Sequence, residues 1–408
     1  MRQPNRVLTS RAEAVDVARD LAPRLRERAL ETERQRRTHD DSIRELLRSG
    51  LFGLLVPKRF GGSELGMAAM FEAAVEMSQG CGSTGWVFGV ISGHMWLTAL
   101  FPEQTQGEVF EDPDSLVSIV IRFGQSTNPS RVDGGYLWRD GSGRFCSGID
   151  HANWVALGGA VEGPDGRSEQ RYFMVPRADV EIVDDWFTTG LRGTGSKSIR
   201  IKEAFIPEHR SVRLDGLNNG TSPGAQLHPN PLYRLTMGAA MPMGLAAPSI
   251  GIAREALDTV AATQGQRLER VSPEQLGESS AMFARLAQAA GNIDAAFNLL
   301  MNDCERLDAL EAPEGWTAFD WSRIGFHRAY SARLCRDVVN SLFDASGGSG
   351  IYETTTIQRL WRDGNAACAH GGFHWDTAAP GFGRQLLGLP PSRFARAGRA
   401  RVPEPAAR

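Results

Sequence analysis

The sequence predicts an α+β fold in three parts: a helical domain at residues 1–114, a β domain at 115–213 and a helical bundle at 232–395. Three observations predict it. In the first part apolar residues recur at helical spacing. In the middle part short β-rich runs lie between turn signals, and in the last part long segments again carry apolar residues at helical spacing. Residues 214–231, rich in Gly, Asn and Pro, are expected to form a linker or loop, and 396–408 a disordered tail.

The first part contains two helix patterns with clear ends. "HDDSIRELLRSG" has acidic residues in its first turn, apolar residues at helical spacing and Gly50 as a stop signal. "MAAMFEAAVEMSQG" follows the same pattern and ends at Gly80.

The middle part is a series of short strands. The β-rich runs are "SLVSIVIRF", "GGYLWRD", "GRFCSGI", "WVALGGAV", "RYFMVP", "VEIVDDW" and "SIRIKEAFIP". Turn signals such as "DGSG" and "GPDG" separate them, which indicates a compact β-barrel or sandwich.

The last part reads as a bundle. "SAMFARLAQAAGNIDAAFNLLMNDCERLDAL" and "SRIGFHRAYSARLCRDVVNSLFDAS" carry apolar residues three and four apart, as packed helices require.

The composition of the chain argues against some classes of function. The 408 residues have a net charge of −3, with both signs mixed along the chain, so no concentrated basic face predicts nucleic-acid or membrane-surface binding. The five cysteines are scattered, which fits a reducing cytoplasm better than a disulfide framework. No apolar run approaches the length of a membrane span, so we expect a cytoplasmic protein.

"AHGGFHWD" raises the question of a metal site, because His370 and His374 lie four residues apart. A helical zinc pair needs a third ligand, and a hydrolytic one carries Glu between the histidines. Here Gly371 and Gly372 interrupt any helix, so we predict no metal and a histidine at a helix end.

Three other features of the sequence each allow two interpretations. "GLRGTGSKS" is not a phosphate loop, because Ser196 separates glycine from lysine and a strand follows; Thr194 and Ser196 are loop structure or pocket lining. "GGSG" at 347–350 is a helix stop or a close backbone approach to a ligand. His94, within the apolar run "SGHMWLTALF", is a core residue or a catalytic one.

Several segments together resemble one superfamily. "LFGLLVPKRFGGSELG", "GLRGTGSKSIRIKEAFIPEHRSV" and "GGSGIYETTTIQRLWRD" are similar, in that order, to motifs of acyl-CoA dehydrogenase-fold proteins. The resemblance implies an N-terminal helical domain, a central β-barrel domain and a C-terminal four-helix bundle.

Two features of the sequence indicate which branch of this superfamily it resembles: a missing catalytic Glu and a motif of the monooxygenases. After Arg–Asp the dehydrogenases carry a catalytic Glu, where this chain has "GNAACAHGG" with His370. "GGYLWRDGSGRFCSGIDHANW" instead resembles the two-component flavin-dependent monooxygenases, which include hydroxylases of 4-hydroxyphenylacetate, steroid-derived phenols and aromatic polyketides.

This resemblance implies cofactors and partners. A separate reductase would supply reduced FMN or FAD, and O2 would react with the flavin to give a C4a-hydroperoxide that hydroxylates a small aromatic substrate. The resemblance also implies a homotetramer.

It implies roles for residues as well. Ser147 would hydrogen-bond flavin N5, His370 would lie beside C4a and N5, and His94 would draw the proton from a phenol. The further residues expected to contact flavin are Arg122, Phe123, Gly148, Arg267 (at the phosphate), Gly347 and Gly348.

Three alternatives remain at this point. The chain could be an acyl-CoA dehydrogenase or oxidase that keeps its flavin, or an N- or S-oxygenase that needs no phenol base at His94. It could also be a degenerate binding or scaffold protein.

Overall fold

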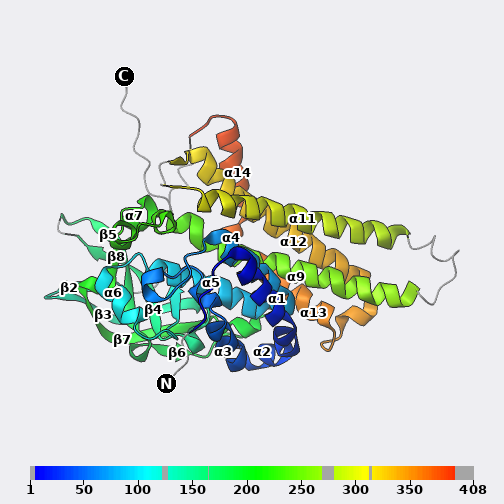
Figure 1. Cartoon of the computed structure of the whole chain (residues 1–408), viewed down its shortest axis with the longest axis horizontal. Helices are drawn as coiled ribbons and strands as arrows, with labels where there is room; N and C mark the ends of the chain where they lie inside the picture. Colours follow the sequence, from blue (N-terminus) through cyan, green and yellow to red (C-terminus); the bar gives the residue numbers. More distant parts are fainter. Residues whose placement is uncertain (1–4, 122–126, 164, 269–279, 312–314, 391–408) are drawn as a thin grey trace.

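The computed structural model describes residues 5–121, 127–163, 165–268, 280–311 and 315–390. Figure 1 shows a body of helices and strands from which long helices project at one end. None of the described helices combines the length and apolar composition required to cross a bilayer.

The N-terminal part is helical, as predicted. Its helices are α1 (Arg11–Glu27), α2 (Ala29–Gln35), α3 (Asp40–Arg48), α4 (Met67–Gly80), α5 (Gly82–Thr98) and α6 (Glu103–Phe110). The stop signal after α3 is confirmed, because Gly50 has φ 83, which glycine adopts without strain. The predicted end of α4 at Gly80 is also confirmed.

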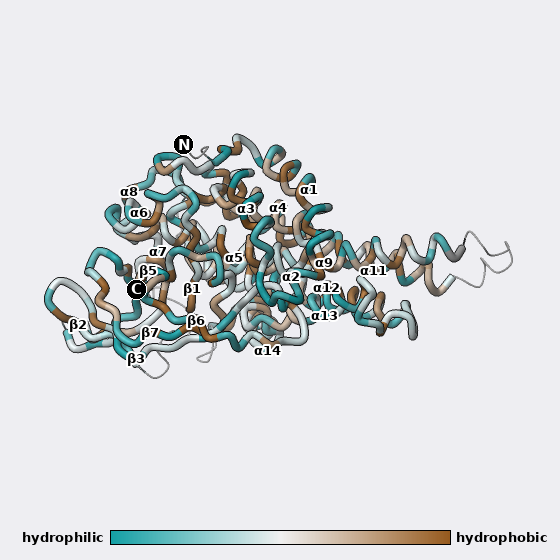
Figure 2. Tube along the Cα trace, turned by 90° about the horizontal axis from the view of Figure 1, so that it is seen from below, coloured by the Kyte–Doolittle hydropathy of each residue, from teal (hydrophilic) through white to brown (hydrophobic). Residues whose placement is uncertain are grey.

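Helix α5 is the centre of this part. All 17 of its residues are buried, and it contacts α4, α9, β1 and the short turn η5 (Arg192–Thr194). Figure 2 shows hydrophobic stretches at β1 and between α4 and α5. Side chains on α5 are therefore fixed by packing on every side.

The middle part forms two four-stranded sheets. Of the two arrangements expected, a barrel or a sandwich, this is the sandwich. The strands are β1 (Val117–Val120), β2 (Ser130–Val132), β3 (Gly135–Cys146), β4 (Trp154–Glu162), β5 (Ser168–Pro176), β6 (Glu181–Val183), β7 (Lys197–Pro207) and β8 (Ser211–Arg213). One sheet has the order β1-β4-β5-β8 and the other β2-β3-β7-β6, and their inner side chains share one core.

Two local expectations were wrong. The "DGSG" signal does not turn the chain, because β3 continues through it and pairs with β7 from Gly135 to Cys146. The expected linker at 214–231 contains two short helices, α7 (Leu214–Asn219) and α8 (Pro223–Leu227), the second begun by a Ser222 cap.

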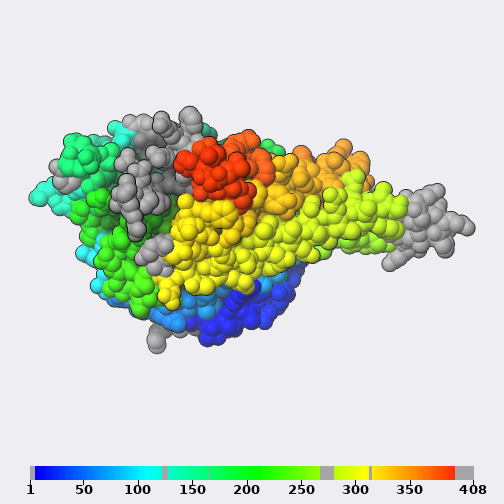
Figure 3. Space-filling view, turned by 90° about the horizontal axis from the view of Figure 1, so that it is seen from above, coloured from blue at the N-terminus to red at the C-terminus, as the bar shows by residue number. Residues whose placement is uncertain are grey.

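The C-terminal part is the expected four-helix bundle. It consists of α9 (Met237–Leu268), α11 (Ser280–Asp308), α12 (Ala318–Ala345) and α13 (Thr356–Cys368), with α14 (Trp375–Leu386) packed on α12. Figure 3 shows α14, in red, on the outer surface of the bundle. Asp308 joins the bundle to the first domain, since its carboxylate accepts from the backbone N–H groups of Met67 and Ala68 at the start of α4.

Candidate active site

Trp86 joins two of the three predicted catalytic residues. Its Nε1–H donates to Ser147 Oγ at 3.3 Å, and its ring packs edge-on against His370 with centroids 5.7 Å apart. Trp86 lies on α5, Ser147 follows β3, and His370 follows α13. The site therefore forms where the three parts of the chain meet, and Trp86 is a residue that the sequence analysis missed.

The chain is irregular just before Ser147. The pairing of β3 with β7 shifts between Gly143 and Cys146, and Phe145 has φ 65, a strained value for a bulky residue. The Phe145 ring is 66% exposed, and the edge of Trp186 supports it at 6.0 Å between centroids. Strain of this kind concentrates at functional sites, and here it holds an aromatic face open to solvent beside Ser147.

Gly148 brings the chain against α5. It has φ 72, and a Cβ there would lie 3.0 Å from Ile91 Cδ1 and 3.2 Å from Val87 Cγ1. Glycine satisfies both the backbone angle and the close approach. The predicted site residue Gly148 therefore fixes where Ser147 lies, through its close approach to α5.

Three buried hydroxyl groups lie in a row behind the site. Ser147 Oγ is 2.7 Å from Ser196 Oγ, which is 2.7 Å from Thr194 Oγ1. Thr194 Oγ1 then donates to the carbonyl of Leu191 at 2.9 Å. We call Ser147, Ser196 and Thr194 the hydroxyl chain; it places the two residues that the sequence left open directly at Ser147.

Asp363 anchors the end of the hydroxyl chain. Its Oδ1 accepts from the backbone N–H of Leu191 at 2.6 Å, and Leu191 has φ 52, which a branched residue holds only under constraint. Burial raises the pKa of Asp363 to about 6. The Arg–Asp pair quoted from the sequence thus positions the loop that carries Thr194 and Ser196.

His94 is a buried neutral base. Its Nδ1 lies 2.9 Å from the carbonyl of Val117, and burial lowers its pKa to about 4. A carbonyl only accepts, so the neutral ring carries its proton on Nδ1 and keeps a lone pair on Nε2. The sequence left a core role and a catalytic role open for His94. Burial fits both, and an Nε2 lone pair with no hydrogen-bond donor among the described residues fits the catalytic role.

Strand β1 connects His94 to Ser147. The carbonyl of Val117 holds the His94 ring, and the next residue, Ser118, donates from Oγ to the Ser147 carbonyl at 2.8 Å. The structure therefore brings His94, Ser147 and His370 into one region.

His370 caps a short turn beyond α13. Its Nδ1 accepts from the backbone N–H of Gly372 at 3.1 Å, so the neutral ring carries its proton on Nε2. Burial, and then the charge of Arg328, lowers its pKa. His374 is exposed at the start of α14, so the two histidines belong to different elements. Within the described ranges no three metal-ligating side chains gather.

Gly347 and Gly348 lie away from this region. They begin the turn η9 (Gly347–Ile351) after α12, and a Cβ at either would meet nothing within 4 Å. The 13-residue helix α13 separates η9 from His370, a length of about 20 Å. Within one chain these glycines do not meet Ser147.

Arg267 is also distant. α5 contacts α9 as far along as Ile252, which lies against Gly82, and Arg267 lies 15 residues beyond Ile252, about 22 Å further along α9. Arg122 and Phe123 lie outside the described residues.

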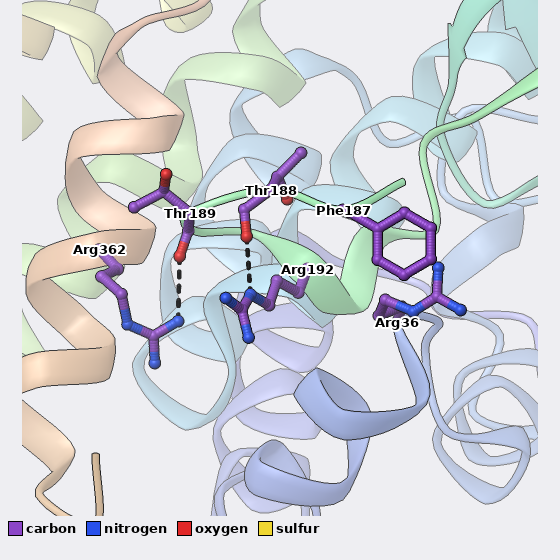
Figure 4. Close-up of a pocket in the computed structure, with 6 residues that line it drawn as sticks. All are labelled: Arg36, Phe187, Thr188, Thr189, Arg192 and Arg362. Atoms are coloured by element: carbon purple, nitrogen blue, oxygen red, sulfur yellow. Dashed lines mark hydrogen bonds between the residues drawn. The ribbon is translucent and has the colours of Figure 1, made fainter. Parts of the chain in front are cut away.

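A separate pocket of 420 Å³ opens on the solvent side of the same loop (Figure 4). Its lining residues are Arg36, Phe187, Thr188, Thr189, Arg192 and Arg362. Two of its guanidinium groups already donate to the loop, Arg362 to the Thr189 carbonyl at 3.0 Å and Arg192 to that of Thr188 at 2.6 Å. These two arginines thus hold the loop from its solvent side, and the hydroxyl chain lies on its buried side.

Comparisons with known proteins agree with this arrangement. Residues 10–108 match the family described as acyl-CoA dehydrogenase, N-terminal domain, and residues 243–375 match acyl-CoA dehydrogenase, C-terminal domain. The oxygenase subunit HsaA of a flavin-dependent monooxygenase from Mycobacterium tuberculosis is 35% identical, over 91% of this chain and 94% of HsaA.

Two further comparisons point the same way. The oxygenase component of an FADH2-dependent resorcinol hydroxylase from a Rhizobium species is 33% identical, over 91% of this chain and 93% of its own. The crystal structure of HsaA from M. tuberculosis superposes with a TM-score of 0.86 at 33% identity, covering 95% of this chain and all of that one.

These matches decide between the branches that the sequence left open. The relatives are oxygenase subunits, and Ser147 and His370, on which the resemblance to that branch rested, both contact Trp86. The chain belongs to the oxygenase subunits of the flavin-dependent monooxygenases, which have the acyl-CoA dehydrogenase fold.

Proposed function

We propose that this enzyme hydroxylates a small phenolic substrate with O2, using reduced FMN or FAD from a separate reductase. The observation that carries the proposal is His94: a buried, neutral imidazole whose Nε2 lone pair accepts no hydrogen bond from the residues that the structure describes, on the helix that also carries Trp86. A phenol has a pKa near 10, and its O–H can donate to Nε2. The negative phenolate beside the ring would raise the pKa of the imidazole, so the pair together would favour the electron-rich phenolate.

The residues around Trp86 fit a flavin. A flavin ring is flat and aromatic and carries hydrogen-bonding nitrogens on one edge, and the site offers the exposed face of Phe145 and the hydroxyl of Ser147. Ser147 would lie against N5. When bound, reduced flavin supplies the electrons that activate O2.

His370 would act on the other side of Trp86. Its Nδ1 accepts from the backbone N–H of Gly372, so Nε2–H is the ring group left to donate a hydrogen bond. Its pKa is lowered by burial, so the ring is neutral at pH 7 and can hold a proton there without adding a charge.

We further propose that the enzyme is a homotetramer in which each flavin is completed by a neighbouring chain. A helix of about 20 Å separates Gly347 and Gly348 from His370, Arg267 lies beyond the contact of α5 with α9, and open space surrounds the two glycines. Beside them Ile351 and Tyr352 are each 65% exposed, as apolar side chains at a contact between chains would be.

The remaining proposals follow the family. Arg122 and Phe123 would line the flavin ring, since they follow β1, whose Ser118 bonds to Ser147. A reducing cytoplasm is the compartment that we assign, because all five cysteines are buried and free.

The test is product analysis with isotopic oxygen. The enzyme, a flavin reductase, FMN or FAD, and a panel of phenols are incubated under ¹⁸O2, with matched substrates that offer only nitrogen or sulfur. We expect one ¹⁸O atom in a hydroxylated phenol. Hydrogen peroxide as the sole product across the panel, or oxygen only on nitrogen or sulfur, would contradict the proposal.

A further inference from the structure

The hydroxyl chain has a favoured direction. Thr194 has one hydroxyl proton, and the Leu191 carbonyl can only accept it, so Thr194 must accept from Ser196. Ser196 therefore gives its proton to Thr194 and must accept from Ser147. Ser147 in turn gives its proton to Ser196 and accepts from the indole N–H of Trp86. All four bonds exist together only in this direction.

The end of the chain is well anchored. The Leu191 carbonyl also accepts from Trp186 Nε1 at 3.1 Å, and the Leu191 N–H is held by Asp363. Ser196 and Thr194 are 4% and 1% exposed, so water cannot replace a lost partner. Reversing the direction would break the bond from Thr194 Oγ1 to the Leu191 carbonyl, which would keep Trp186 Nε1 and the Thr194 backbone N–H as donors. The forward direction is therefore favoured by one buried hydrogen bond.

Ser147 is therefore an acceptor toward any ligand. Its proton points to Ser196, one lone pair receives the Trp86 N–H, and the second lone pair is left for the site. A ligand that offers a hydrogen at this point is favoured, and one that offers a lone pair is opposed.

We propose that the hydroxyl chain makes the site select reduced flavin over oxidised flavin. Reduced flavin carries a hydrogen on N5, whereas N5 of oxidised flavin has only a lone pair. The proposal rests on the proposed function, which sets N5 against Ser147. Ser196 and Thr194 are positioning residues that act through Ser147. Oxidised flavin either faces an acceptor at N5 or requires the chain to reverse with the loss of one buried hydrogen bond, so the preference should be roughly tenfold.

The experiment measures dissociation constants for oxidised FMN and, without oxygen, for reduced FMN, with FAD in parallel. We expect the wild-type enzyme to bind the reduced form at least about tenfold more tightly. Ser196→Ala leaves the Ser147 proton free to turn toward oxidised N5, so the preference should fall by about tenfold, mainly through tighter oxidised flavin. The midpoint potential of bound flavin should then fall by about 30 mV for each tenfold of lost preference.

Two variants at Thr194 repeat the test independently of Ser196. Thr194→Val frees the Ser196 proton to turn toward Ser147, so the preference should also fall. Thr194→Ser keeps the hydroxyl group and should restore it. If Ser196→Ala does not fold, the Thr194 pair decides the matter.

Ser118→Ala is the matched control. Ser118 donates to the backbone carbonyl of Ser147 and leaves its Oγ untouched, so the preference for reduced flavin should persist. An equal loss in Ser118→Ala and Ser196→Ala would show general loosening and overturn the proposal. So would a wild-type preference that Ser196→Ala and Thr194→Val both retain. A wild-type enzyme that binds neither form would instead overturn the proposed function itself.

Discussion

Asp363 Oδ1 accepts a hydrogen bond of 2.6 Å from the backbone N–H of Leu191, although 172 residues separate the two in sequence. The bond ties α13, which leads to His370, to the loop that ends the hydroxyl chain. It also holds Leu191 at φ 52, so the carbonyl of this residue faces Thr194.

This relationship predicts how Asp363 responds to substitution. Asp363→Ala removes the acceptor for a buried N–H group and should lower the free energy of unfolding by about 2–3 kcal/mol. Asp363→Asn keeps an oxygen in the same place and should retain most of the stability. Urea unfolding of both variants checks this, and an equal loss in the two would show that the hydrogen bond is not the cause.

His94 predicts a pH dependence of stability. Its pKa is about 4 in the folded protein and about 6.5 when unfolded, so its contribution is present above pH 6.5 and is lost as the pH falls through 4. Between pH 7 and pH 5 the wild-type enzyme should lose about 2 kcal/mol more than His94→Gln, which does not titrate.

The comparison with His94→Gln isolates that effect. Asp308 and Asp363 both have folded pKa values raised to about 6 by burial, so their contributions run the opposite way and are lost as the pH rises through 6. Both carboxyl groups are present in the wild-type enzyme and in His94→Gln, so their contributions to the pH dependence cancel in the comparison. Equal pH profiles in urea unfolding would show that the folded His94 titrates normally.

His94 also predicts a chemical effect. His94→Ala should lower phenol hydroxylation by about 10²–10⁴-fold, because the base that favours the phenolate is gone. The absorbance of a bound phenol should show its pKa rising in the variant. Unchanged turnover, with unchanged phenolate absorbance, would favour oxygenation at nitrogen or sulfur.

Gly148 offers a test with a matched control. Gly148→Ala meets both a positive φ of 72 and two side chains of α5, whereas Gly166→Ala meets a positive φ of 74 in nearly open space. Each should lose about 1 kcal/mol from backbone strain, and Gly148→Ala more, with weaker flavin binding as well. Denaturation and flavin titration check this; equal effects of the two substitutions would contradict the packing role.

The order of domains could be predicted because period and composition change along the chain. The errors were local. "DGSG" in β3 has the composition of a turn, but β7 pairs with residues before it, within it and after it. No sequence pattern reveals this partner, which lies 60 residues away. The stretch at 214–231 forms helices too short to show a period.

The site was only partly predictable for a related reason. Because α5 is buried all round, its apolar pattern has no polar face, and nothing marks Trp86 as a site residue. Ser147 and His370 came from resemblance, whereas Ser196, Thr194 and Asp363 matter through contacts between distant segments. Composition could place these residues in a loop and a helix but not next to one another.

The central claim is that Ser147 lies against the flavin of an oxygen-activating site. The direct measurement mixes the anaerobic complex of enzyme and reduced FMN rapidly with O2 and follows the absorbance. We predict a long-lived spectrum that differs from both reduced and oxidised flavin, and in Ser147→Ala a decay at least about tenfold faster. Immediate reoxidation of the wild-type complex with stoichiometric hydrogen peroxide, or equal decay in the variant, would contradict the claim.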